Sequence, residues 1–155
     1  MDLSPPERQL AIRRAVALLC AQHGWVVLHE MPLPNGRRAD LMAMRPDGGF
    51  VCIEVKSSPR DFLADAKWPE YREFCDALHF AVDDAFPLAL LPGPVGVIVA
   101  CGLEAAILRD APIHPLPPAR RRALLQRFAT IAARRLAALE DPMITASLRA
   151  ALRVE

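Results

Sequence analysis

The sequence predicts an α/β protein with a mixed central β-sheet and helices on both of its faces. Two groups of three short apolar runs have the composition of strands, and a segment with helical composition precedes each group. Two further helical segments close the chain. Asp47-Gly48 joins two of the strand-like runs, which is a hairpin signal. This order of elements is typical of a sheet that helices cover on both sides.

The first helix is predicted over residues 5–22. Ser4 can cap its N-terminus, prolines suit its first turn, and Glu7 stands three residues after the cap, which makes a capping box. Gly24 is a suitable stop signal. Three strands are expected next, over residues 25–31, 37–44 and 50–57. The Asp-Gly turn lies between the second and third, so these two strands should be antiparallel neighbours.

A second helix is predicted over residues 58–78, with a break before Pro69, because proline lacks an N–H group and disfavours helix in the residue before it. Three more strands are expected, over residues 79–82, 95–100 and 104–109. A long amphipathic helix is predicted over residues 119–139. Asp141 should cap a short final helix that extends to residue 153.

The length and composition fit one globular domain, residues 1–155, with a core over about 4–112 and a helical extension over about 117–153. The net charge is only +1, so any argument for nucleic-acid binding must come from local charge. We find neither a signal peptide nor an apolar run of membrane-spanning length. The four cysteines are widely spaced in apolar contexts. We therefore expect a cytoplasmic protein with reduced thiols and no membrane partner.

Two charged residues stand inside a run that otherwise reads as a buried strand, "FVCIEVK". Alternation places Glu54 and Lys56 on the same face of this strand. Across the Asp-Gly turn, Asp40 is about as far before the turn as Glu54 is after it, so the two carboxylates are expected to be cross-strand neighbours. Burial of these charges is costly unless they are paired or bind an ion.

Two interpretations account for this cluster. The first is a structural salt bridge in which Lys56 satisfies Asp40 and Glu54. The second is a metal site, because two facing carboxylates repel each other unless a cation lies between them. Oxygen ligands of this kind suit Mg²⁺ or Mn²⁺, with water completing the coordination shell.

The pattern D-x13-E-x-K, on a hairpin with a helix before and after it, resembles the PD-(D/E)xK nuclease core, a restriction-endonuclease-like fold. The resemblance implies that Asp40 and Glu54 are catalytic metal ligands, together with the backbone carbonyl of Val55. It implies that Lys56 orients or deprotonates the attacking water and stabilises charge on the phosphate. Many members add an acid on the first helix, where this chain has Glu7. Glu7 is either such a ligand or only the partner of the helix cap.

Many nucleases of this group carry Q-x-x-x-Y on the helix after E-x-K. Here Lys67 stands in the place of the Gln and Tyr71 in that of the Tyr, and Lys67 could still contact phosphate. The wider sequence from Leu10 to Pro112 resembles the MmcB-like family of bacterial proteins linked to DNA repair. That resemblance implies a nuclease-like repair role, with DNA and repair proteins as partners.

Several other side chains are candidates for accessory or DNA-binding roles. Asp65 could tune the site or be solvated, and Glu30 is a further candidate acid on the first strand. Arg38 shares a face with Asp40 and could pair with it or reach a phosphate. Arginines recur every seven residues on the long C-terminal helix and form one basic stripe: Arg120, Arg127 and Arg134. Such a stripe suits a phosphate backbone, and a solvated helix face is the alternative.

The favoured hypothesis is a Mg²⁺- or Mn²⁺-dependent deoxyribonuclease that hydrolyses phosphodiester bonds in DNA repair. The alternative is a non-catalytic module with a nuclease fold that binds DNA or a repair partner. A third hypothesis, a structural ion pair in an unrelated α/β protein, predicts no metal affinity. The sequence does not select an oligomeric state, and a homodimer is one of the alternatives.

Overall fold

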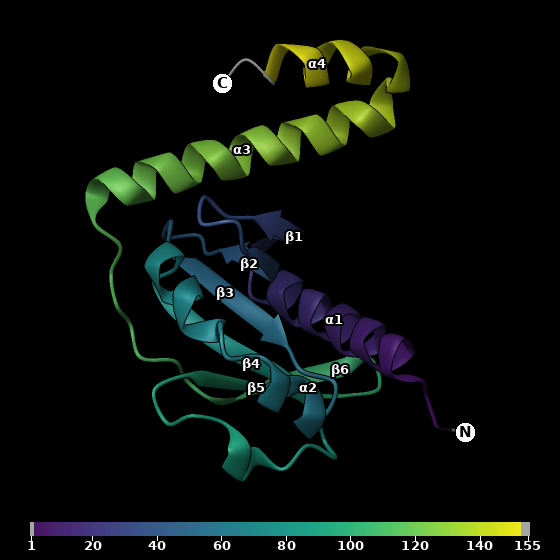
Figure 1. Ribbon diagram of the computed structural model, residues 1–155, viewed down its shortest axis with the longest axis vertical. Coiled ribbons are helices and arrows are strands. Elements are labelled where there is room, and N and C mark those ends of the chain that lie inside the picture. The colour runs from purple at the N-terminus through teal and green to yellow at the C-terminus, as the bar shows by residue number, and fades with distance from the viewer. Residues whose placement is uncertain (1, 153–155) are drawn as a thin grey trace. The chain divides into compact units, whose positions relative to one another are not determined.

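The protein contains a six-stranded mixed β-sheet whose strands follow chain order from one edge to the other (Figure 1). The computed structural model describes residues 2–152. The strands are β1 (Val26–Pro32), β2 (Arg38–Met44), β3 (Phe50–Val55), β4 (Ala77–Asp83), β5 (Gly96–Cys101) and β6 (Glu104–Arg109). β4 runs parallel to β3 and β5, whereas the remaining neighbours are antiparallel. The predicted mixed α/β architecture is confirmed.

The helices and the sheet belong to two compact units, residues 2–116 and residues 117–152. The helices are α1 (Pro5–Gln22), α2 (Pro59–Ala64), α3 (Pro118–Glu140) and α4 (Thr145–Leu152), and the 3₁₀ turns are η1 (Trp68–Phe74), η2 (Leu88–Leu90) and η3 (Pro142–Ile144). The first unit holds the sheet with α1 and α2, and the second holds α3 and α4. Within the described residues, no helix has both the length and the apolar character needed to cross a membrane.

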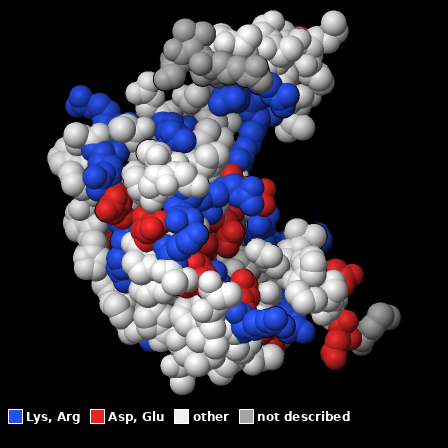
Figure 2. Space-filling model, viewed as in Figure 1, with Lys and Arg blue, Asp and Glu red and all other residues white. Residues whose placement is uncertain are grey.

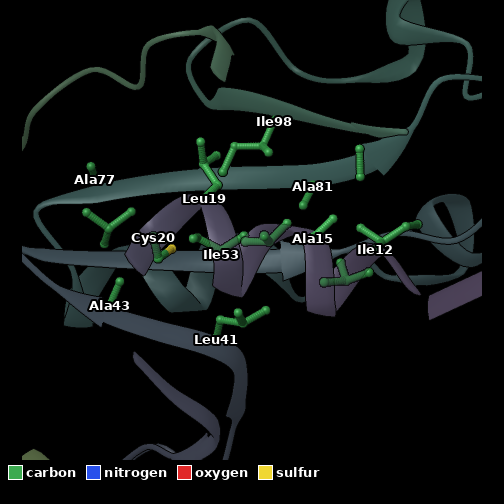
Figure 3. Packing of buried hydrophobic residues seen from close by; sticks show 14 residues of the cluster. Ile12, Ala15, Leu19, Cys20, Leu41, Ala43, Ile53, Ala77, Ala81 and Ile98 are labelled. Carbon is green, nitrogen blue, oxygen red and sulfur yellow. The ribbon is translucent and has the colours of Figure 1, made fainter. Parts of the chain in front are cut away.

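α1 packs one of its faces against the sheet and forms a core of small and branched side chains with it (Figure 3). The buried positions recur at helical spacing: Ile12, Ala15, Val16, Leu19 and Cys20. They contact alternate residues of the strands, including Leu41, Ala43, Ile53, Ala77, Ala81 and Ile98. Alanines on both the helix and the strands allow the two layers to approach closely. This layer covers the face of β3 that does not carry Glu54.

The other face of β3 and β4 is covered by the connection between these two strands. Phe62 of α2 and Trp68 of η1 both meet the ring of Phe80 edge-on, at centroid distances of 5.4 and 5.6 Å. Trp68 is thus a packing residue. Every residue of β3 is buried. A charged side chain in this strand must therefore find its partners inside the protein.

The helix predicted over residues 58–78 is wrong in its extent. α2 ends at Ala64, Asp65 has extended backbone angles, and a 3₁₀ turn follows at Trp68–Phe74. Pro69 accounts for the break, since it lacks an N–H group for a continuous helix. Ala77 was predicted as helix but opens β4, where it pairs in parallel with Val51 of β3. Burial between the neighbouring strands outweighs the helical preference of alanine there.

The final helix also differs from the prediction. Asp141 does cap it, by accepting a hydrogen bond from the Met143 N–H at 3.1 Å, but the capped segment is the 3₁₀ turn η3. The α-helical segment α4 begins only at Thr145. The predicted end at residue 153 lies outside the described residues.

Asp76 is a buried carboxylate that connects three separate segments of the first unit. One oxygen accepts the Phe50 N–H at 2.7 Å, and the other accepts the Leu116 N–H at 2.8 Å. The backbone of Asp76 binds Phe50 and His114 as well. The side chain thereby fixes the start of β3 and the Pro-rich connection that follows β6.

We predict that Asp76→Ala destabilises the protein by about 2–5 kcal/mol, because two buried N–H groups lose their acceptors. Asp76→Asn, which keeps one carbonyl acceptor, should cost less. Urea denaturation of both variants measures the difference. Asp84→Ala serves as the control, since Asp84 is exposed. Equal stability of wild type and Asp76→Ala would contradict the assigned role.

Candidate active site

The β2–β3 hairpin brings Asp40 and Glu54 together. Leu41 pairs with Ile53 in the antiparallel ladder, so Asp40 and Glu54 form the next pair along it. The Asp40 N–H donates to Glu54 Oε1 at 3.1 Å, and the Val55 N–H donates to Asp40 Oδ2 at 2.8 Å. The two carboxyl groups therefore lie side by side at the end of the hairpin, as the sequence predicted from the position of its turn.

Burial makes this carboxylate pair unfavourable in its fully ionised form. Burial and then the charge of Asp40 raise the pKa of Glu54 to about 9. Burial likewise raises the pKa of Asp40, although the Val55 N–H and the charge of Lys56 oppose this. At neutral pH the pair therefore retains a proton. A cation between the two groups would allow both to ionise.

Lys56 lies at the same end of β3 and is held by Asp65. Its ammonium Nζ is 2.7 Å from Asp65 Oδ2, and its side chain is almost fully buried. The other oxygen of Asp65 accepts the Lys67 N–H at 3.0 Å. Burial pushes the pKa of Asp65 upward, but its bonds to Lys56 and Lys67 outweigh burial and lower it. Asp65 is thus an ionised partner that fixes the direction of the lysine.

The accessory motif residues have different environments. Tyr71 is buried, and its hydroxyl donates to the Arg38 carbonyl at 3.2 Å, which links η1 to β2 two residues before Asp40. Burial and the nearby Glu54 raise the pKa of Tyr71, so it remains a neutral donor. Lys67 has an exposed side chain. The Lys67 backbone contributes to the site, because its N–H donates a hydrogen bond to Asp65.

Glu7 closes the capping box of α1. Its Oε2 accepts from the Ser4 N–H at 2.8 Å and from the Ser4 hydroxyl at 2.5 Å, and these bonds lower its pKa. Across the described residues 2–152, no three His, Cys, Asp or Glu side chains gather closely enough to form a metal site. The carboxyls of Asp40 and Glu54 are the side-chain oxygens that meet at the end of the hairpin, and the role of the Val55 carbonyl stays a prediction.

A hollow opens in front of Asp40, and arginines lie at its rim. Arg37, Arg38 and Tyr71 line it together with Asp40. Arg37 forms an ion pair with Glu70 of η1. On the face shown in Figure 2, basic and acidic side chains are interleaved, in keeping with the small net charge. Recognition of a charged ligand would thus depend on local groups at this rim.

Sequence patterns gave little or no indication that two residues near the site, Glu30 and Arg13, contribute to it. Glu30 of β1 contacts both Arg38 and Arg13, and Arg13 projects from α1. The charge of Arg13 is close enough to lower the pKa of Asp40. No motif marks Arg13, because its approach to β1 and β2 depends on how α1 packs on the sheet.

The predicted basic stripe lies on α3, in the second compact unit. Arg120 and Arg134 are exposed and Arg127 is half-buried. The spacing of seven residues places the three on one side of the helix. Their role in DNA binding stays a prediction.

We predict that Glu54→Gln changes the pH dependence of stability. The folded protein holds the Glu54 proton up to about pH 9, whereas an unfolded chain releases it near 4.5. Between these values the folded state binds more protons, so its stability falls as the pH rises. The variant should be more stable than wild type at pH 8 by about 2–4 kcal/mol, and this difference should shrink towards pH 5. Urea denaturation in EDTA across this range is the measurement, and parallel profiles for the two proteins would contradict the prediction.

Comparison with known proteins places the chain in a family. A family described as "DNA repair protein MmcB-like" matches residues 1–143. A solved structure of a protein of unknown function from Silicibacter pomeroyi is 46% identical, has a TM-score of 0.82, and the match covers 92% of this chain and 96% of that chain. No curated protein matches the sequence. Because the family match spans nearly all of the chain, this protein belongs to the MmcB-like family of DNA repair proteins.

Proposed function

We propose that this protein is a divalent-metal-dependent deoxyribonuclease that hydrolyses phosphodiester bonds during DNA repair. The observation that carries the proposal is the convergence of Asp40, Glu54 and Lys56 at one end of a buried hairpin. Such a cluster is unfavourable for stability, and strongly perturbed carboxyl groups are typical of functional sites. The family membership supports the repair context, and the resemblance to the PD-(D/E)xK core supports the reaction.

The residues at the hairpin fit Mg²⁺ or Mn²⁺. Their donors are all oxygen atoms, which these ions prefer. The carboxyls of Asp40 and Glu54 share one location and hold a proton that a cation would displace. The Val55 carbonyl follows Glu54 directly in the chain. When bound, the metal would act as a Lewis acid and lower the pKa of a coordinated water.

Lys56 supplies the second positive charge that the reaction requires. We assign its ammonium group to a non-bridging oxygen of the scissile phosphate, where it stabilises the charge that develops as water attacks. Asp65 is the positioning residue, because its ion pair fixes the buried lysine. Tyr71 positions β2 through the Arg38 carbonyl. The exposed side chain of Lys67 is assigned to a neighbouring phosphate, in place of the Gln of related nucleases.

The substrate backbone would be held by arginines. Arg38 lies at the rim of the hollow in front of Asp40. We also assign the stripe of Arg120, Arg127 and Arg134 on α3 to DNA phosphates. Arginine suits this role because its planar fork binds phosphate oxygens in pairs.

The alternative is a non-catalytic module that keeps the fold and binds DNA or a repair partner. The replacement of Gln by Lys67 and the engagement of Glu7 in the helix cap favour this alternative. Metal affinity and cleavage separate the two functions, because a binding module requires neither.

We predict that Asp40→Asn abolishes cleavage. The assay is a panel of labelled single-stranded, duplex, flap, fork and four-way-junction DNAs with Mg²⁺ or Mn²⁺. The rate on a cleaved substrate should fall by about a hundredfold or more, since loss of a metal ligand exceeds the effect of outer-shell changes. Asp84→Asn is the matched control, at an exposed aspartate. If wild type cuts no DNA in the panel, or Asp40→Asn cuts as fast, the nuclease proposal fails and the binding module moves ahead.

We predict that Lys56→Gln lowers kcat about a hundredfold while the affinity for Mn²⁺ stays equal or becomes slightly tighter, because a repelling charge is removed. Asp65→Asn should lower kcat less. In the double variant, the Asp65 change should add almost nothing, because its effect acts through the lysine. Single-turnover kinetics and calorimetric Mn²⁺ titration supply the two readouts. Additive losses in the double variant would refute the positioning role of Asp65.

A further inference from the structure

We propose that Arg13 and Arg38 form a binding site for a DNA backbone phosphate beside Asp40, and that the carboxylate of Glu30 occupies this site in the free protein. The inference rests on the proposed function only in taking DNA as the ligand. It adds Arg13 of α1 to the DNA-binding surface, and it identifies Glu30 as a group of the protein that competes with DNA for that surface.

The two arginines converge on a single oxygen atom. Glu30 Oε1 lies 3.5 Å from Arg13 Nη2 and 3.8 Å from Arg38 Nη2. Arg13 comes from α1 and Arg38 from β2, so the packing of the helix on the sheet creates this arrangement. A carboxylate between two guanidinium groups occupies the position that a phosphate oxygen would take.

The backbone of Glu30 is held in an unusual conformation. Its φ is +48°, and no other non-glycine residue among residues 2–152 has a positive φ. Glu30 lies between two regular pairs of the β1–β2 ladder, His29 with Leu41 and Met31 with Ala39, so its place in the register is opposite Asp40.

 The pairing of Met31 with Ala39 resumes the regular ladder directly after it. A left-handed φ costs a residue such as glutamate about 1–3 kcal/mol, and such strain is typical of functional sites.

The Arg13 side chain is partly exposed and has an N–H group that a ligand could use. Its side chain is about one-fifth exposed (19%), and among the described residues no acceptor bonds its buried Nε. It contacts Glu30, whose place in the β1–β2 register is opposite Asp40. Arg38 lines the hollow in front of Asp40. A phosphate bound by both arginines would thus lie next to the proposed reaction centre.

Glu30 can leave this position because its ion pairs are long and partly exposed. The Glu30 side chain is 45% exposed and that of Arg38 is 65% exposed. Ion pairs of this kind contribute little to stability. A DNA phosphate, supported by contacts elsewhere on the backbone, can therefore replace the carboxylate. In the free protein, the same carboxylate weakens non-specific binding of nucleic acid by neutralising the arginines.

The test measures DNA binding by fluorescence anisotropy in EDTA, with a labelled duplex and a labelled single strand, so that cleavage plays no part. Glu30→Gln should tighten binding about fivefold to tenfold, because the competing charge is lost. Arg13→Gln should weaken binding by a similar factor and reduce the salt slope by about one. In the Arg13→Gln background, the gain from Glu30→Gln should become smaller.

Matched controls separate this site from a general effect of charge. Arg14 is the exposed neighbour of Arg13 on α1, and Glu104 is exposed on β6. Arg14→Gln and Glu104→Gln should change the affinity less than the corresponding site variants. Thermal melting checks that every variant is folded. Glu30→Gly is a second variant that tolerates the positive φ, and it should tighten binding as Glu30→Gln does.

The opposite results overturn the inference in distinguishable ways. Unchanged or weaker DNA binding by both Glu30 variants, or an Arg13→Gln variant that matches Arg14→Gln, would remove the phosphate site while leaving the nuclease proposal standing. A loss of Mn²⁺ affinity in Glu30→Gln, measured by calorimetry, would make Glu30 a metal ligand and refute its role as a competitor. If the site variants respond as expected but wild type cleaves nothing, the phosphate site stands and the nuclease proposal fails.

Discussion

The register of the β2–β3 hairpin is the constraint on which the candidate site depends. Because Leu41 pairs with Ile53, Asp40 and Glu54 meet at the next position and exchange hydrogen bonds with the neighbouring backbone. A shift of one residue would turn Glu54 towards α1 and bury its charge in the apolar core. The apolar residues on the opposite face of the hairpin therefore stabilise the register and, with it, the position of both carboxyls.

Each charged group of the site is held by a different element of the same unit. α2 and the turn after it supply Asp65 for Lys56, and η1 supplies Tyr71 for β2. α1 supplies Arg13, whose charge reaches Asp40. The connection between β3 and β4 is irregular because Pro69 interrupts the helix; within this connection Asp65 binds Lys56, and Trp68 and Tyr71 contact the sheet.

The buried carboxylate pair lowers the stability of the folded protein at neutral pH. Burial raises the pKa of both groups, so the folded protein carries a proton that a bound cation would release. Glu30 has a related role under our proposal, because its strained backbone keeps an anion between two arginines. Under our proposals, a bound divalent cation would replace the proton of the carboxylate pair, and a bound phosphate would replace the Glu30 carboxylate between the arginines.

Local sequence patterns predicted the order of strands and helices, the Asp-Gly hairpin and the meeting of Asp40 with Glu54, because periodicity and turn chemistry act over short distances. They also marked Lys56 and Tyr71 through their motif. The packed fold was needed to show that Ala77 joins β4, that Asp65 binds Lys56, and that Arg13 and Asp76 have partners far away in the chain. These contacts depend on parallel strand pairing and on the packing of α1, which no local pattern encodes.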